Sequence, residues 1–159
     1  MNLTALNLPR APLRLSRKNE VISVFCVVRK KNLVLTPEEW VRQHIIHYLI
    51  HQLETPVGLI SSEAGIKVNT LDRRCDILVY GMNKKVKLLV ECKAPDISIN
   101  EKVLHQIAQY NSKIQADYLW LSNGIHHKFY LINKAENKLV ELESLPKYSE
   151  MWFTIKILC

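Results

Sequence analysis

The sequence predicts an α/β fold in which one central mixed β-sheet is flanked by helices and preceded by an N-terminal β-hairpin. Runs of β-branched and aliphatic residues alternate with two segments of helical periodicity. Each helical segment opens on the residue pattern of a capping box. The predicted order is a hairpin, a helix, three strands, a second helix and two strands, which is typical of helices that cover a sheet.

The chain of 159 residues has the length of a single domain. Residues 1–12 include two prolines and are expected to form an extended arm. Residues 13–35 are expected to form the N-terminal strands, because the run from Val21 to Val28 is rich in β-branched residues. The core is then predicted to span 36–132, followed by a C-terminal extension at 133–159.

The first helix has clear start and stop signals. Thr36 can cap it, Pro37 suits its first turn, and Glu39 completes the capping box. Apolar residues then recur at helical spacing until Thr55 and Pro56, which are expected to end the helix.

The remaining strands are predicted from short apolar runs bounded by turn residues. These strands span residues 59–68, 76–80, 86–93, 117–122, 127–132 and, in the tail, 151–158. Gly65 is a candidate β-bulge. A capping box formed by Ser98 and Glu101 is expected to begin a second helix that runs to about Lys113.

Composition narrows the functional classes. The formal net charge of +7 favours a polyanionic partner, because Lys and Arg displace counterions from phosphates. The four cysteines are far apart and form no CxxC pair, which argues against a zinc ribbon and against a disulfide framework. No apolar stretch has the length of a signal-peptide core or of a membrane span, so we expect a cytoplasmic protein with reduced thiols.

Three charged residues interrupt two otherwise apolar predicted strands. Side chains alternate along a strand, so Glu91 and Lys93 share one face and Cys92 points to the other. The short turn between the strands can bring Asp76 alongside Glu91. Two carboxylates and the backbone carbonyl of Cys92 suit a hard cation such as Mg²⁺ or Mn²⁺. Such a cation can activate water against a phosphodiester, while Lys93 positions that water or stabilises charge in the transition state.

The same pattern also has a purely structural interpretation. Lys93 and Glu91 would form an ordinary ion pair at a strand end, and Asp76 would cap a turn. In the second predicted helix, Gln106 and Tyr110 are four residues apart and therefore lie on one face. Both can hydrogen-bond a phosphate or a catalytic side chain, or they can belong to a helix surface with a buried tyrosine.

Taken together, Asp76, the segment Glu91–Lys93 and the pair Gln106 and Tyr110 resemble the PD-(D/E)XK nuclease superfamily, including its QxxxY element. Four segments are similar to the N-terminal nuclease domain of type I restriction enzyme R subunits, in a stand-alone form. These segments are 36–43, 74–76, 91–95 and 122–124. The resemblance extends from about residue 13 to about residue 145.

This resemblance implies a restriction-endonuclease-like core and a Mg²⁺- or Mn²⁺-dependent endonuclease or exonuclease that cleaves DNA, of restriction or repair type. It assigns catalytic roles to Asp76, Glu91, Lys93, Gln106 and Tyr110, and metal binding to Asp76, Glu91 and Cys92. In that family an early helix often adds an acidic residue. Glu38 and Glu39 both match, and Glu39 is favoured, because it lies near the Gln43 side of the helix, although it can also be a capping residue only.

The sequence departs from the family pattern in two ways. Cys75 stands where the superfamily motif has a proline. The ATP-binding pattern GxxxxGK[ST] is absent from the chain, so the motor activity of full R subunits is not implied.

Two other interpretations stay open. The chain is either a catalytically weak nucleic-acid-binding subunit of a larger restriction or defence complex, or an unrelated α/β protein whose pattern is accidental. The expected partners are DNA, in double-stranded form, restriction-system or helicase subunits, and a second copy in a homodimer; RNA is not distinguished from DNA. Arg73 and Arg74 contact phosphate or belong to a solvated loop. Glu63 is an accessory acid or the partner of Lys67.

Overall fold

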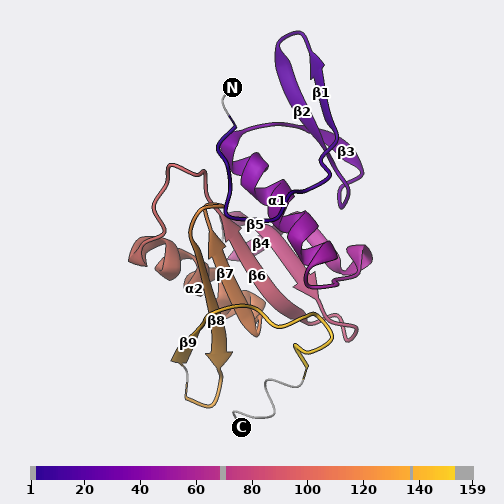
Figure 1. Ribbon diagram of the computed structural model, residues 1–159. Helices are drawn as coiled ribbons and strands as arrows, with labels where there is room; N and C mark the ends of the chain where they lie inside the picture. Colours follow the sequence, from indigo (N-terminus) through magenta and orange to yellow (C-terminus); the bar gives the residue numbers. More distant parts are fainter. Residues whose placement is uncertain (1–2, 69–70, 137, 153–159) are drawn as a thin grey trace.

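In the computed structural model, the described residues 3–68, 71–136 and 138–152 form two β-sheets and two α-helices (Figure 1). Side chains are described for all of these residues except 66–68, 71–73 and 110. The first sheet contains β1 (Leu15–Lys18), β2 (Val21–Cys26) and β3 (Lys31–Val34). The second contains β4 (Ile60–Val68), β5 (Leu71–Tyr80), β6 (Val86–Cys92), β7 (Tyr118–Ser122), β8 (His127–Asn133) and β9 (Lys138–Leu142). The helices are α1 (Pro37–His51) and α2 (Glu101–Ile114), with a short 3₁₀ helix, η1, at Val57–Leu59.

The six-stranded sheet is mixed, as predicted. Its strands lie side by side in chain order, and β6 and β7 are parallel, whereas the other neighbouring pairs are antiparallel. A parallel pair needs a crossover connection, which α2 supplies. One core cluster joins Val90 and Trp120 to α1, and a second joins Leu89 and Leu119 to α2, so the two helices cover opposite faces. The predicted α/β class, with an additional N-terminal sheet, is confirmed.

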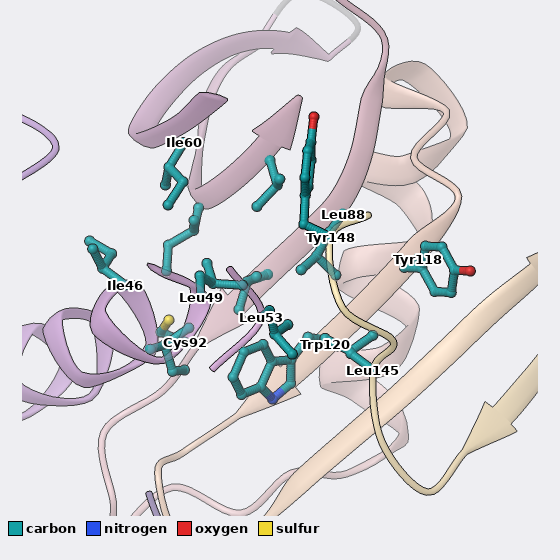
Figure 2. Packing of buried hydrophobic residues seen from close by; sticks show 14 of the residues in the cluster. Ile46, Leu49, Leu53, Ile60, Leu88, Cys92, Tyr118, Trp120, Leu145 and Tyr148 are labelled. Atoms are coloured by element: carbon teal, nitrogen blue, oxygen red, sulfur yellow. The ribbon is translucent and has the colours of Figure 1, made fainter. Parts of the chain in front are cut away.

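The larger core cluster fills the space between α1 and the six-stranded sheet (Figure 2). Leu49 of α1 lies near Leu88 and Trp120, which come from β6 and β7. The segment after β9 adds Leu145 and Tyr148 to the same cluster. The C-terminal extension therefore completes the core. Of the helices in the described residues, none is long and apolar enough to cross a membrane.

The position of α1 between the two sheets explains the burial of several of its polar residues (Figure 1). As predicted, the Thr36 side chain accepts a hydrogen bond of 3.0 Å from the Glu39 N–H group, and Pro37 is in the first turn. The N-terminal sheet contributes Cys26 and Leu33 to the cluster that contains α1. The polar residues buried by this double cover are Glu39, Arg42, Gln43, His44 and His47. Buried polar groups need partners, so the first turns of α1 require a network of hydrogen bonds and ion pairs.

The N-terminal arm, predicted as extended, is docked on the turn between β7 and β8. The Asn7 N–H group donates to the Gly124 carbonyl oxygen at 2.7 Å, and Nε2 of His127 lies 3.0 Å from the Asn7 carbonyl oxygen. Gly124 has a φ of +82°, and a Cβ atom there would lie 2.7 Å from the Leu6 side chain. Only glycine combines this backbone conformation with so close an approach of the arm.

Two predicted element starts are wrong. β5 begins at Leu71, five residues before Asp76, because it pairs with β4 over the whole length of that strand. Asp76 therefore lies inside a strand. The cap of α2 is Asn100, whose side chain accepts hydrogen bonds from the N–H groups of Lys102 and Val103, so the helix does not begin at the Ser98 capping box.

The β4 and tail predictions need similar correction. Gly65 pairs with Arg74 in regular register, so the predicted bulge is wrong; the irregular residue of β4 is Glu63, with a φ of +53°. In the tail, β9 forms where no strand was predicted. Of the predicted strand at 151–158, Met151 and Trp152 form a turn, and the rest lies outside the described residues.

Candidate active site

The two predicted site carboxylates meet where β5 and β6 run side by side. β5 and β6 are antiparallel and Ile77 pairs with Val90, so Asp76 and Glu91 occupy the next opposing positions. Oδ2 of Asp76 accepts a hydrogen bond of 2.6 Å from the Cys92 N–H group. The predicted pairing of these strands is confirmed, and with it the proximity of Asp76 to Glu91.

A local irregularity gives Asp76 its position. Cys75 packs in the cluster below α2 and Ile77 in the cluster below α1, so the regular alternation of faces is interrupted at Asp76. Across the β4–β5 pair, Glu63 occupies the opposing position with a left-handed backbone. The Glu63 carboxylate forms an ion pair with Arg29 of the β2–β3 turn. Glu63 was expected to be either an accessory acid or the partner of Lys67. The side chain of Lys67 lies outside the described residues.

Glu91 connects β6 to α2. Its Oε1 atom accepts hydrogen bonds from Nζ of Lys93 at 2.7 Å and from Nε2 of Gln106 at 3.2 Å. Burial and the negative charge of Asp76 raise the pKa of the Glu91 carboxyl to about 7. Burial acts to lower the pKa of Lys93, but its hydrogen bond to Glu91 and the nearby carboxylates raise it above the ordinary value. Lys93 is therefore an ammonium at neutral pH.

Arg42 of α1 links the helix to Asp76. Its Nη2 atom donates to Oδ1 of Asp76 at 2.8 Å and to Oε1 of Glu38 at 2.7 Å, and its Nη1 atom bonds Glu39. Glu39 also accepts from Nε2 of Gln43 at 2.7 Å. The Nε atom of Arg42 is buried and has no hydrogen-bond partner among the described residues. The guanidinium is thus held by three carboxylates.

The two candidate acids of α1 have different surroundings. Glu39 is buried and bonds Arg42 and Gln43. Glu38 is 43% exposed, and its negative charge acts on the pKa values of both Glu91 and Lys93. Glu38 is therefore the more accessible of the two acids, although the sequence favoured Glu39.

The loop after Lys93 is fixed by the turn between β7 and β8. The Lys93 N–H group donates to the Ser122 carbonyl oxygen at 2.8 Å. The side chain of Asn123 donates to the carbonyl oxygens of Ile97 at 2.8 Å and Pro95 at 3.4 Å. Two of the segments singled out in the sequence, 91–95 and 122–124, therefore lie side by side at the end of β6.

The family model for the type I restriction enzyme R protein N terminus (HSDR_N) matches residues 37–146, from the start of α1 to beyond β9. This chain belongs to that family. The match includes Asp76, Glu91, Lys93 and both acids of α1, whereas residues 1–36 precede it.

One solved structure is similar to this member of the HSDR_N family. It is a fragment of a protein assigned as the HsdR subunit of a type I restriction enzyme from Vibrio vulnificus YJ016, at 16% sequence identity and a TM-score of 0.44. The similarity covers 58% of this chain and 20% of that chain, so this chain spans a small part of that protein. No curated protein sequence matches the chain.

Arg42 is the site residue that sequence reasoning missed. Its spacing from Glu38 and Glu39 on one helix is the signal that could have found it, because residues three and four apart on a helix are neighbours. Two predicted residues, Tyr110 and Arg73, have side chains outside the described residues. Arg74 is exposed on β5, and no contact with the carboxylates is among its described interactions.

The side chains around the site offer oxygen donors to a cation. Burial and the neighbouring carboxylates raise the pKa of Cys75 to about 12, and burial raises the pKa of Cys92 well above its ordinary value, so both are neutral thiols. Among the described residues, no three His, Cys, Asp or Glu side chains converge to hold a metal ion. The oxygen atoms of the Asp76 and Glu91 carboxylates are the charged donors that lie together here.

Proposed function

We propose that this member of the HSDR_N family is a nuclease with a PD-(D/E)XK site that hydrolyses phosphodiester bonds of DNA, using Mg²⁺ or Mn²⁺. The observation that carries the proposal is the convergence of Asp76, Glu91 and Lys93 at the end of β6, where Nζ of Lys93 is 2.7 Å from Oε1 of Glu91. Two carboxylates and an ammonium at one point are the parts that metal-assisted phosphodiester hydrolysis requires.

Asp76, Glu91 and the Cys92 carbonyl would hold the cation. The donor set fits it, because all three are oxygen ligands and two are carboxylates; burial and repulsion by Asp76 together raise the pKa of Glu91. A bound divalent cation supplies Lewis acidity to the scissile phosphate and to a water molecule. The bond from Arg42 to Oδ1 of Asp76 would then compete with the cation for the same oxygen.

Lys93 and Gln106 both hydrogen-bond Glu91, one from the residue after β6 and the other from α2. Gln106 donates to Glu91 and fixes the orientation of its carboxylate. Lys93 cannot bind a cation, because an ammonium has no lone pair. It would instead hold the attacking water or stabilise the negative charge that develops on the phosphate. Glu38, the more exposed of the two α1 acids, would be the one that joins the site.

The test is cleavage by the purified full chain in Mg²⁺, in Mn²⁺ and in EDTA. Substrates are supercoiled plasmid, linear duplex and single-stranded DNA, so that nicking and end-dependent digestion are both detected. We expect metal-dependent products from wild type and none from Glu91→Gln, which keeps the shape of the side chain. Absence of cleavage of every substrate in both metals would overturn the proposal.

A second function is supported by the way the carboxylates are already occupied. Both oxygens of Asp76 are bonded by protein groups, and Oε1 of Glu91 accepts two hydrogen bonds. These oxygens have hydrogen-bond partners without a cation, which suits a nucleic-acid-binding subunit of a restriction complex that cleaves little or nothing. DNA binding in EDTA, without cleavage in either metal, distinguishes this function from the first.

A further inference from the structure

The positive charge of the chain is concentrated at its N-terminal end. Residues 1–36 contain seven Lys and Arg and one Glu, a formal charge of +6. Residues 37–159 contain 15 Lys and Arg and 14 Asp and Glu, a formal charge of +1. The boundary between these parts coincides with the start of the family match at residue 37. Residues 1–36, which include the three-stranded sheet of β1, β2 and β3 and the segments that connect its strands, therefore carry most of the net positive charge that could attract a polyanion.

This three-stranded sheet has one buried and one open face. Val24 and Cys26 of β2 are fully buried and point toward the core. Phe25 lies between them, so Phe25, Ser23 and Val21 occupy the other face of β2, together with the positions that pair with them. The open face accordingly presents Ser16 and Lys18 of β1, and Arg14 just before β1, together with Val21, Ser23 and Phe25 of β2. In Figure 1 the β1–β2 hairpin extends away from α1 and from the six-stranded sheet.

The cations of this face are ordered and available. The guanidinium of Arg14 lies 4.0 Å from the centre of the Phe25 ring, a cation–π contact that restricts its movement. Ion pairs engage Arg17 and Arg29 of the same sheet. Among the described residues, no carboxylate pairs with the cations Arg14, Lys18, Lys30 and Lys31. Serine hydroxyls beside them are hydrogen-bond donors suited to phosphate oxygens.

One end of this sheet lies beside the candidate active site. The β2–β3 turn is attached to β4 by the ion pair of Arg29 with Glu63, and Glu63 opposes Asp76 across the β4–β5 pair. Lys30 belongs to that turn and the exposed Lys31 follows it as the first residue of β3, whereas Lys18 is at the far end of β1. The six residues of β2 span about 20 Å, which equals the rise of about six base pairs of duplex DNA.

We propose that the open face of β1–β3 and the β2–β3 turn bind the phosphate backbone of double-stranded DNA next to the candidate active site. The assignment of DNA as the polyanion rests on the proposed function. The duplex is held by Arg14 and Lys18 of the open face and by the exposed Lys30 and Lys31 at the β2–β3 turn, and the contact extends about six base pairs from the site. Because these contacts go to phosphate, binding depends on salt and is independent of base sequence.

The experiment compares two variants of the full chain with equal net charge. One carries Arg14→Gln, Lys18→Gln, Lys30→Gln and Lys31→Gln. The matched control carries Lys84→Gln, Lys85→Gln, Lys102→Gln and Lys113→Gln, all at exposed positions of the remaining chain. Binding of a fluorescent 20-base-pair duplex, a length about three times the expected contact, is measured by anisotropy in EDTA over a range of NaCl concentrations. Thermal unfolding of both variants verifies that they are folded, and the single variant Lys18→Glu replaces the first if it is not.

We expect the N-terminal variant to bind about tenfold or more weakly than wild type, with a salt slope reduced by about three. The control should change affinity by less than about threefold, because it alters only the diffuse field. Equal losses in the two variants, or no loss in the first, would overturn the proposal. Tighter binding of wild type to poly-glutamate than to the duplex would also overturn it and would indicate an acidic protein surface as the partner.

Because EDTA removes divalent cations, this result is independent of cleavage. Duplex binding through the sheet by a protein that cuts nothing leaves this proposal standing and removes the nuclease proposal. Metal-dependent cleavage by wild type, together with normal duplex binding by the N-terminal variant, would support the nuclease proposal and remove this one.

Discussion

Each end of β6 carries a lysine bonded to a carboxylate, but the two clusters have opposite charge balances. Near its start, Nζ of Lys87 bonds Oδ2 of Asp117 at 2.7 Å, and Nζ of Lys134 bonds Oδ1 of the same residue at 2.6 Å. One carboxylate therefore serves two ammonium groups, and Lys87 also lies 4.3 Å from the Trp152 ring centre. Near its end, four carboxylates share Arg42 and Lys93 as their cations. The four are Glu38, Glu39, Asp76 and Glu91.

The difference shows how to separate a structural ion pair from a candidate site. Burial is similar in the two clusters, since Lys87 is 7% and Glu91 is 4% exposed. A buried ion pair is therefore weak evidence of function by itself. The excess of negative charge at the Glu91 end is what sets it apart, because uncompensated charge in a partly buried position costs stability unless something binds there.

The largest expected contrast is in cleavage. Lys93→Ala should reduce kcat by about 100-fold or more, because it removes an electrostatic group from the reacting phosphate, while the fold and most metal binding are retained. Lys87→Met, at the other end of the strand, should leave the kcat of folded protein unchanged. Single-turnover cleavage at saturating Mg²⁺ measures both. Wild-type rates from Lys93→Ala would remove its catalytic role, and equal losses in both variants would indicate a general structural effect.

The second contrast is in stability as a function of pH. The pKa of Glu91 is raised to about 7 in the folded protein, so the folded chain keeps this proton while the unfolded chain loses it near pH 4.5. Wild type should therefore lose stability relative to Glu91→Gln as the pH rises from about 4.5 to about 7, by about 3 kcal/mol in total. Urea unfolding of both proteins in EDTA across this range measures the difference. If the difference in unfolding free energy between the two proteins does not change with pH, the pKa of Glu91 is not raised by folding.

Lys87→Met should destabilise the protein at neutral pH, whereas Glu91→Gln should stabilise it. The Lys87 variant should lower the free energy of unfolding by about 1.5 kcal/mol at neutral pH, because Asp117 is buried and keeps only Lys134 as a partner. Lys134→Met is the matched control, since Lys134 is 57% exposed and should contribute less. Unfolding in urea measures both variants. A larger loss for Lys134→Met would contradict this ranking.

The smallest contrast concerns metal affinity. Arg42→Met should bind Mn²⁺ about tenfold more tightly than wild type, because the guanidinium competes for Oδ1 of Asp76 and repels a cation. The same variant should have a lower Tm in EDTA, and Mn²⁺ should raise that Tm more than it raises the Tm of wild type. Calorimetry and thermal unfolding give the two readings. Weaker Mn²⁺ binding by the variant would show that Arg42 supports the site instead of competing with its cation.

The sequence was informative wherever structure depends on neighbouring residues. The positions of Asp76, Glu91 and Lys93 follow from strand periodicity and a short hairpin turn, and the start of α1 follows from Thr36. Arg42 was missed because its bond to Asp76 joins residues 34 positions apart and forms only when α1 packs against the sheet.

Contacts between residues far apart in the sequence also explain why the predicted starts of α2 and β5 were wrong. The loop before α2 is held by Asn123, so the helix begins at Glu101 although Ser98 offers a similar capping pattern. The early start of β5 and the irregular backbone of Glu63 likewise depend on partners across the sheet.

The docked arm has a consequence for the order in which the protein is made. Asn7 bonds His127, a residue 120 positions later in the chain. Synthesis runs from N- to C-terminus at about 5 to 20 residues per second, so the arm waits several seconds for its binding surface. The turn at Gly124 receives Leu6 only after most of the sheet has been synthesised. The arm is thus made before the sheet but finds its native partners after most of it.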